Sequence, residues 1–208
     1  MIEIQNWGII DFKDAWKRQK ELVKEIQEKR NRNVLVLCQH PTVITIGRNG
    51  SNENITVNRD FLEYSGIAVY EIDRGGDVTL HNPGQLVGYP IFNLSSYHED
   101  LHWFLREIEG AIIELVEEYG IKAKRIKDLT GVWVDGQRKI CAMGLHSSRW
   151  VTYHGFALNV SNDLSEFGYI VPCGIRNKDV TSINSETGKE VVFENVLKEC
   201  INVFEKRF

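Results

Sequence analysis

The sequence predicts an α/β fold of the α+β type, in which helices pack on a mixed or antiparallel sheet. Three observations lead to this class. Segments with strand character outnumber segments with helical periodicity. Several strands are joined by turns short enough for hairpins, the clearest being Asp135-Gly136. The helical segments carry an apolar stripe on one side only, which is typical of helices that cover a sheet.

Length and composition bound the class of protein. The 208 residues suffice for one well-buried core, so we expect a single domain over residues 1–208. Apolar runs stay below the ~18 residues that indicate a membrane span, and the N-terminus lacks the pattern of a secretory signal. The net charge of −4 argues against a nucleic-acid surface. We therefore expect a soluble, cytoplasmic protein that binds neither membranes nor nucleic acids.

The first part of the chain predicts one helix and two strands. Residues 11–29 place apolar side chains at helical spacing among many charges, which is typical of an amphipathic surface helix. Residues 33–38 form an apolar run and residues 42–47 alternate in part, so both predict strands. His40-Pro41 between them predicts a turn, and the polar segment 48–54 predicts a loop.

The next segments lead into a loop with a glycine pair. A short helix is predicted at 59–63, and a strand at 67–72 runs directly into the loop around Gly75-Gly76. Another strand is predicted at 86–94. The glycine pair either forms a simple turn or allows the backbone to approach a ligand closely, and its residue types alone leave both interpretations open.

The clearest helix is predicted at residues 99–119. Its apolar side chains follow the 3.6-residue period, and Ser96 and Glu99 have the spacing of a capping box. His98, Glu99 and His102 match the H-E-x-x-H pattern of zinc peptidases. The pattern falls on the first turn of the predicted helix rather than within it, so we predict no metal site.

The last third of the chain predicts a hairpin pair and a final helix. Strands at 131–134 and 138–146 flank the two-residue hairpin turn. A turn at Ser147-Ser148 then leads into a strand at 149–159. Residues 191–206 repeat the periodicity of an amphipathic helix.

Four widely spaced cysteines, without a C-x-x-C pair, are expected to be reduced. Cys38 falls in an apolar strand and Cys200 on the apolar stripe of the last helix, so both are predicted to be core residues. Cys173 stands between Pro172 and Gly174, in a turn that can present its thiol.

Cys173 is thus the favoured nucleophile, and Cys141 remains a rival. Only about 3% of a free cysteine is ionised at pH 7, so a nucleophilic thiol needs a nearby cation or base. Lys139 can supply either. Period-two alternation predicts that Cys141 lies on the same strand face as Lys139.

A basic cluster stands out in an acidic protein. It consists of Lys122, Lys124, Arg125 and Lys127. The cluster is either a solvated face or a dock for an acidic carrier protein.

Four motifs resemble the lipoyl(octanoyl) transferase family, and they occur in the same order along residues 34 to 184. They are Asp73-Arg-Gly-Gly-Asp-Val-Thr-Leu-His-Asn-Pro-Gly-Gln85, Lys139-Ile-Cys-Ala-Met-Gly-Leu145, Tyr153-His-Gly-Phe-Ala-Leu-Asn-Val160 and Pro172-Cys-Gly-Ile175. Asn82 departs from the glycine expected at its position. Because asparagine tolerates left-handed backbone better than most residues, we expect the turn to remain.

The resemblance implies which residues act. Cys173 would carry the acyl group and Lys139 would be its catalytic partner. His154 and Gln85 would support the site. The substrate-contacting residues would be Arg74, Gly75, Gly76, Asp77, Val78, Thr79, Leu80, His81, Ala142, Met143, Gly144, Gly155, Phe156 and Ala157.

The resemblance also implies a biotin/lipoate ligase-like catalytic fold and a reaction. An octanoyl group would pass from octanoyl-acyl carrier protein, through a cysteine acyl-enzyme, to a lysine of a lipoyl domain. This would be the first step of protein lipoylation from endogenous octanoate. The acceptors would be lipoyl domains of 2-oxoacid dehydrogenase complexes or the glycine cleavage H protein, with no cofactor. The alternatives are an ATP-dependent lipoate or biotin ligase and a non-catalytic relative that binds acylated carrier.

Overall fold

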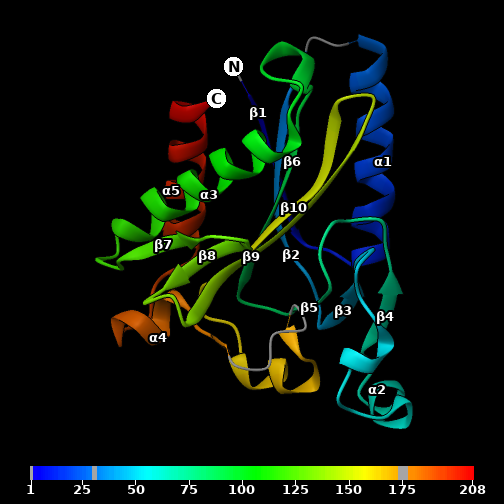
Figure 1. The fold of residues 1–208 in the computed structure, drawn as a ribbon, viewed down its shortest axis with the longest axis vertical. Coiled ribbons are helices and arrows are strands. Elements are labelled where there is room, and N and C mark those ends of the chain that lie inside the picture. Colours follow the sequence, from blue (N-terminus) through cyan, green and yellow to red (C-terminus); the bar gives the residue numbers. More distant parts are fainter. Residues whose placement is uncertain (1, 30–31, 173–177) are drawn as a thin grey trace.

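Two sheets and the helices around them form the fold (Figure 1). A computed structural model describes residues 2–29, 32–172 and 178–208. The large sheet has the order β1 (Glu3–Ile9), β2 (Val34–Gln39), β6 (Gln85–Ile91), β10 (Val151–Asn159), β9 (Arg138–Ser148), β8 (Leu129–Val134) and β7 (Ala123–Ile126). A short β11 (Asp179–Val180) also pairs with β9. The small sheet has the order β4 (Ala68–Glu71), β3 (Val43–Ile46) and β5 (Val78–His81).

Helices cover both faces of the large sheet. Helix α1 (Phe12–Lys29) lies on one face, and α3 (Leu101–Glu117) and α5 (Phe193–Arg207) lie on the other (Figure 1). The remaining helices are short: α2 (Arg59–Tyr64), α4 (Ile183–Thr187) and the 3₁₀ turns η1 (Asn52–Asn54), η2 (Leu94–Ser96) and η3 (Leu164–Tyr169). None of the helices in the described part of the chain has the length and apolar character to cross a bilayer.

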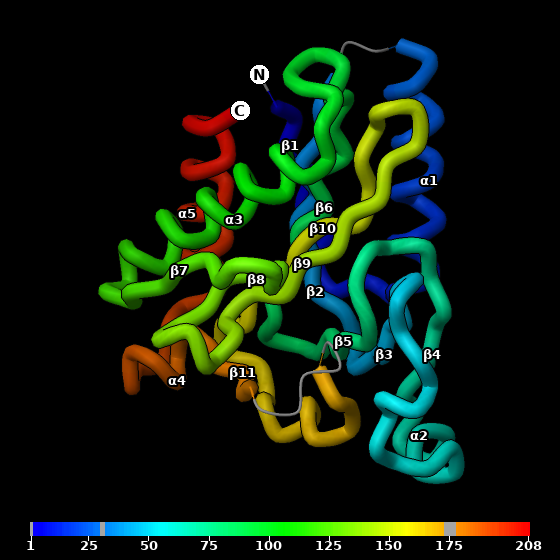
Figure 2. The backbone as a smooth tube through the Cα atoms, in the orientation of Figure 1, coloured from blue at the N-terminus to red at the C-terminus, as the bar shows by residue number. Residues whose placement is uncertain are grey.

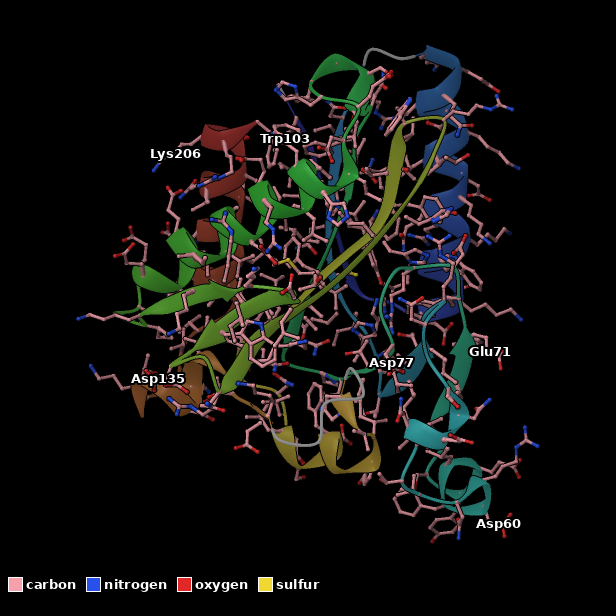
Figure 3. All side chains as sticks on the ribbon, viewed as in Figure 1. Asp60, Glu71, Asp77, Trp103, Asp135 and Lys206 are labelled. Atoms are coloured by element: carbon pink, nitrogen blue, oxygen red, sulfur yellow. The ribbon has the colours of Figure 1, made fainter. Side chains whose placement is uncertain are left out.

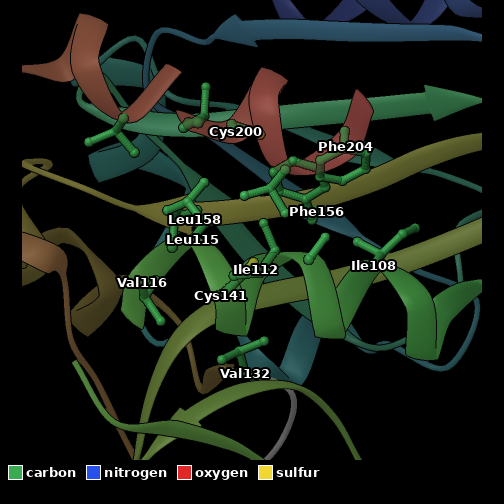
Figure 4. Close-up of a cluster of buried hydrophobic side chains, with 14 of the residues drawn as sticks. Ile108, Ile112, Leu115, Val116, Val132, Cys141, Phe156, Leu158, Cys200 and Phe204 are labelled. Atoms are coloured by element: carbon green, nitrogen blue, oxygen red, sulfur yellow. The ribbon is translucent and has the colours of Figure 1, made fainter. Parts of the chain in front are cut away.

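The core follows from the period of each element. Phe156 and Leu158 of β10 point to the side on which α3 contributes Ile112 and Leu115 and α5 contributes Phe204 (Figure 4). All five side chains are at most 2% exposed. Burial of one such side chain stabilises a fold by roughly 1.5–3 kcal/mol, so this layer fixes the sheet beneath the site.

The predicted fold class is confirmed: the sheets are mixed, with parallel pairs at β1–β2, β3–β4 and β9–β11 and antiparallel pairs elsewhere. The predicted Asp135-Gly136 turn is also confirmed, because both residues have positive φ, 51° and 71°, as a type I′ hairpin requires. Both long amphipathic helices and the final helix lie where their periodicity predicts them.

Two local predictions were wrong. The turn between β9 and β10 lies at Arg149 and Trp150, both with positive φ, and not at Ser147-Ser148. The helix predicted from residue 99 begins at Leu101, and its N-cap is Asp100, whose carboxylate accepts from the N–H groups of His102 and Trp103. Glu99 instead accepts a hydrogen bond from Ser95 Oγ at 2.8 Å.

Candidate functional site

A mostly apolar pocket lies where the small sheet meets β9, β10 and the start of α1. It is lined by Phe12, Ile72, Arg74, Gly76, Asp77, Val78, Thr79, His81, Val87, Tyr89, Ala142, Met143, Gly144, His154, Gly155, Phe156 and Ala157. The lining therefore contains all the predicted substrate-contacting residues except Gly75 and Leu80. Leu80 packs into the core of the small sheet instead.

Gly75 does not line the pocket, but its backbone joins the pocket loop to β9. Its N–H donates to the carbonyl of Leu145 at 3.0 Å, which ties the loop at residues 73–77 to β9. A Cβ on Gly144 would collide with the carbonyl oxygen of Gly75, so the glycine at 144 permits this close backbone contact. The backbone at Gly75 thus packs closely against β9 at Gly144.

Arg74 and Asp77 fix the same loop from its other side. The Arg74 guanidinium donates to the backbone carbonyl of Thr45 at 2.7 Å and to its hydroxyl at 3.0 Å, both on β3. Asp77 (Figure 3) accepts from the side-chain amide of Asn54 at 2.7 Å and from the N–H of Val78 at 2.7 Å. The loop is therefore held by hydrogen bonds at both ends.

A third contact joins the loop to β10, and no sequence pattern predicts it. Asp73 accepts from His154 Nε2 at 2.8 Å and from the hydroxyl of Tyr153. The hydrogen bond from His154 holds the pKa of the Asp73 carboxyl well below its usual range, so it is ionised at neutral pH. Burial lowers the pKa of His154, so this histidine is neutral. His154 is thus a neutral donor that orients the loop.

A chain of side-chain amides fixes the tautomer of His81. The Thr181 carbonyl can only accept, so Asn159 donates its Nδ2–H there at 2.9 Å and turns its Oδ1 toward Gln85. Gln85 Nε2 donates to that Oδ1 at 2.9 Å, which leaves Gln85 Oε1 to accept from His81 Nδ1 at 2.8 Å. Burial lowers the pKa of His81 to about 3. His81 is therefore neutral, with its proton on Nδ1 and the Nε2 lone pair available in the pocket wall.

Substituting Gln85 should change the charge of His81. In Gln85→Glu a carboxylate replaces the amide oxygen, so the imidazolium gains a partner and the pKa of His81 rises. We expect activity to fall as the pH is lowered through that raised pKa, because Nε2 changes from acceptor to donor. Ring ¹⁵N shifts of His81 measure the change, and Gln137→Glu, on an exposed turn, is the matched control. A parent protein that carries the proton on Nε2 would contradict the tautomer.

Lys139 is buried, 6% exposed, and its Nζ lies 4.6 Å from the centroid of the Trp133 ring. A register shift in β9 places it there. Trp133 pairs with Lys139 whereas the preceding Val132 pairs with Cys141, so Ile140 is an extra residue, a β-bulge. The bulge turns Lys139 to the face that also carries Ala142 and Gly144.

The prediction that Cys141 shares the face of Lys139 was therefore wrong. Cys141 packs with Val132 in the core on the helix side. It is fully buried, and burial raises the pKa of its thiol well above the usual value. Alternation fails here because a bulge adds one residue to the strand without a sequence signal.

The remaining three cysteines are two buried core residues and Cys173. Cys38 and Cys200 are buried core residues, as predicted, and burial raises the pKa of both thiols. A buried, neutral thiol is a poor nucleophile. Cys173, the favoured nucleophile, lies outside the described residues.

Asn82 closes its turn differently from the expected glycine. Gln85 N–H donates to the Asn82 carbonyl at 3.1 Å, and the left-handed residue of the turn is Gly84, with φ of 87°. The Asn82 amide donates to Glu166 Oε2 at 2.7 Å and to the Asp163 carbonyl at 2.8 Å. The asparagine thus fastens η3 to the turn between β5 and β6.

The H-E-x-x-H segment lacks the geometry of a zinc helix. Its first histidine, His98, precedes α3, while His102 lies in the first turn of that helix. The two are therefore not one helical turn apart on a common face. Across residues 2–29, 32–172 and 178–208, no group of three or more His, Cys, Asp or Glu side chains could hold a metal ion.

The chain is similar to lipoyl protein ligases and octanoyltransferases. Residues 11–205 match the lipoyl protein ligase A/B catalytic domain. An octanoyltransferase of Christiangramia forsetii is 44% identical over all of this chain and 95% of that protein. An octanoyltransferase of Solibacter usitatus is 52% identical over 86% of this chain and 81% of its own.

The solved structures agree in fold. A lipoate-protein ligase A bound with ATP superposes with a TM-score of 0.76 at 17% identity, covering 99% of this chain and 85% of that one. A biotin protein ligase from Aquifex aeolicus with biotin and ATP gives 0.58 at 15% identity, covering 100% and 70%. These likenesses confirm the predicted biotin/lipoate ligase-like fold.

Proposed function

Because the chain belongs to the lipoyl protein ligase A/B catalytic domain family, we propose that it is an octanoyltransferase acting on lipoyl domains. The octanoyltransferase relatives, at 44% and 52% identity, support this acyltransferase activity. The donor is octanoyl-acyl carrier protein. The acceptors are lysines of lipoyl domains in 2-oxoacid dehydrogenase complexes or of the glycine cleavage H protein, and the enzyme works in the cytoplasm without a cofactor.

The observation that carries the proposal is the composition of the pocket. Glycine, alanine and apolar side chains form most of its wall, and Phe12, Val87 and Phe156 supply hydrocarbon surface. Such a wall suits a saturated acyl chain, which offers no hydrogen-bonding groups. The buried cation of Lys139 lies on the same strand face as Ala142 and Gly144 of this wall.

The reaction proceeds in two exchanges at one carbonyl carbon. The Cys173 thiolate attacks the donor thioester, and the carrier thiol leaves with a proton. The lysine amine of the acceptor then attacks the acyl-enzyme thioester, loses a proton to Lys139, forms the amide and releases the Cys173 thiolate. Lys139 gives the proton in the first exchange and takes one in the second. Because a thioester is less stable than an amide, the two exchanges together release free energy and need no nucleotide.

Octanoyl transfer is expected to need no ATP. Purified protein mixed with octanoyl-carrier protein and a lipoyl domain should add an octanoyl group to the lipoyl domain, as read by intact mass. The control replaces the carrier by free octanoate plus ATP. Transfer only in that control would identify an ATP-dependent ligase, and transfer in neither mixture would identify a non-catalytic binding protein.

A further inference from the structure

We propose that a lysine stripe on α1, formed by Lys13, Lys17, Lys20 and Lys24, is the docking surface for an acidic protein that carries the acyl donor on a flexible arm. The proposal rests on the proposed acyl transfer and names where its donor protein binds. The four positions follow the spacing i, i+4, i+7 and i+11, which places them on one side of a helix. All four side chains are exposed.

The lysines of the stripe are not held in ion pairs within the described structure. None of the four lysines forms an ion pair with a residue that the structure describes. The acidic residues of α1, Glu28, Glu21, Asp14 and Glu25, form a row that borders the stripe on one side, by the same 100° per residue. A protein of net charge −4 thus presents a continuous basic edge, which attracts an acidic surface.

The stripe borders the pocket. The Nζ of Lys20 lies 3.8 Å from the centroid of the Trp16 ring. The Trp16 ring in turn lies 6.3 Å from the rings of Phe12 and His154, both of which line the pocket. Lysine charges therefore begin one aromatic ring away from the acyl site.

The extent of the stripe favours the donor over the acceptor as its partner. From Lys13 to Lys24 it runs about 16 Å along the helix, at about 1.5 Å per residue. A donor whose thioester sits on a long arm can bind along this length and still reach the pocket. An acceptor lysine projects only its own four-carbon side chain, so its domain must bind at the pocket mouth itself.

The basic cluster predicted from the sequence is less suited to this role. Its strand, β7, lies at the opposite flank of the molecule from α1 (Figure 2). Arg125 is already engaged, with its Nε 3.2 Å from the fully buried carboxylate of Glu109 and a second guanidinium N–H on the Arg106 carbonyl. Part of that cluster therefore holds β7 against α3.

Charge reversal separates the two surfaces. The variant Lys17→Glu/Lys20→Glu/Lys24→Glu should lose on the order of tenfold in kcat/KM for octanoyl-carrier protein at low salt, and the loss should shrink as salt is added. The same variant should keep its kcat/KM for a small octanoyl thioester, which has no acidic protein surface. The matched control, Lys122→Glu/Lys124→Glu/Lys127→Glu, has the same charge change and should keep both activities. Octanoyl transfer by the parent from the small thioester tests the proposed function independently.

Three outcomes would overturn the docking surface. They are an equal loss with both donors, an equal loss in the control variant, and a loss that appears only in KM for the lipoyl domain. If the reversed variant misfolds by circular dichroism, the neutral Lys17→Gln/Lys20→Gln/Lys24→Gln variant replaces it. That variant should show a smaller, salt-dependent loss with the carrier donor alone, and no loss would again reject the surface.

Discussion

Cys173→Ala is expected to abolish the octanoyl adduct that forms on the protein, and Cys141→Ala is expected to retain it. Removal of a catalytic nucleophile typically costs on the order of 10⁴- to 10⁶-fold in turnover, so no adduct should be visible in Cys173→Ala. Cys141 lies in the core between the sheet and α3, with a thiol whose pKa is raised by burial. It therefore cannot reach a thioester in the pocket without local unfolding.

Intact mass after mixing with octanoyl-carrier protein gives the answer directly. Cys38→Ala and Cys200→Ala, which also remove buried thiols, are matched controls for any loss of stability. An adduct on Cys173→Ala that disappears in Cys141→Ala would reject the assignment. Equal adducts on all four variants would place the acyl group on another type of residue.

Both Lys139→Ala and Lys139→Arg are expected to lose most turnover, roughly 10²- to 10⁴-fold, if Lys139 transfers protons. Alanine removes the charge and the proton. Arginine keeps a positive charge that favours the Cys173 thiolate, but a guanidinium does not give up its proton near neutral pH. Iodoacetamide should therefore alkylate Cys173 faster in the arginine variant than in the alanine variant.

Near-parental turnover by Lys139→Arg would reject proton transfer and leave electrostatics as the role. The burial of Lys139 makes it necessary to check that the arginine variant folds. Lys139 is buried against Trp133, so a bulkier arginine must find its place within packed surroundings. A dead arginine variant counts only when its circular dichroism and carrier binding match the parent.

The sequence predicted the elements whose pattern is strong. The long amphipathic helices and the Asp135-Gly136 hairpin have unambiguous periods or turn residues. β1 was not predicted, because its mostly exposed residues mix polar and apolar types without alternation. The sequence of β7 indicates only a basic cluster, since an edge strand with two exposed basic residues resembles a solvated loop. The turn at Arg149 and Trp150 was not predicted, because neither residue type favours positive φ.

The candidate site likewise contains residues that sequence motifs indicate and contacts that they do not. The residues of three motifs, around Gly76, Gly144 and Gly155, line one pocket, although they are far apart in the sequence. The Asp73 contact to Tyr153 and His154 joins residues 80 and 81 positions apart, and no local pattern indicates such a pair. Phe12 was missed because its spacing on α1 marks only a buried side, not what that side faces.

The face of β9 on which Lys139 lies depends on the bulge at Ile140, and not only on the residue types of the strand. Any single substitution at Ile140 leaves the count of β9 unchanged, so a mutational scan would record an ordinary hydrophobic site. Deleting Ile140 would remove the bulge but keep Trp133 opposite Lys139 and Val132 opposite Cys141, so strict alternation would leave Lys139 on the face of Ala142. A strand of the same length without the bulge would instead turn Lys139 toward the apolar layer of α3 and α5, so a relative with one residue fewer here can carry its lysine on the same face, and a relative of equal length needs the bulge to do so.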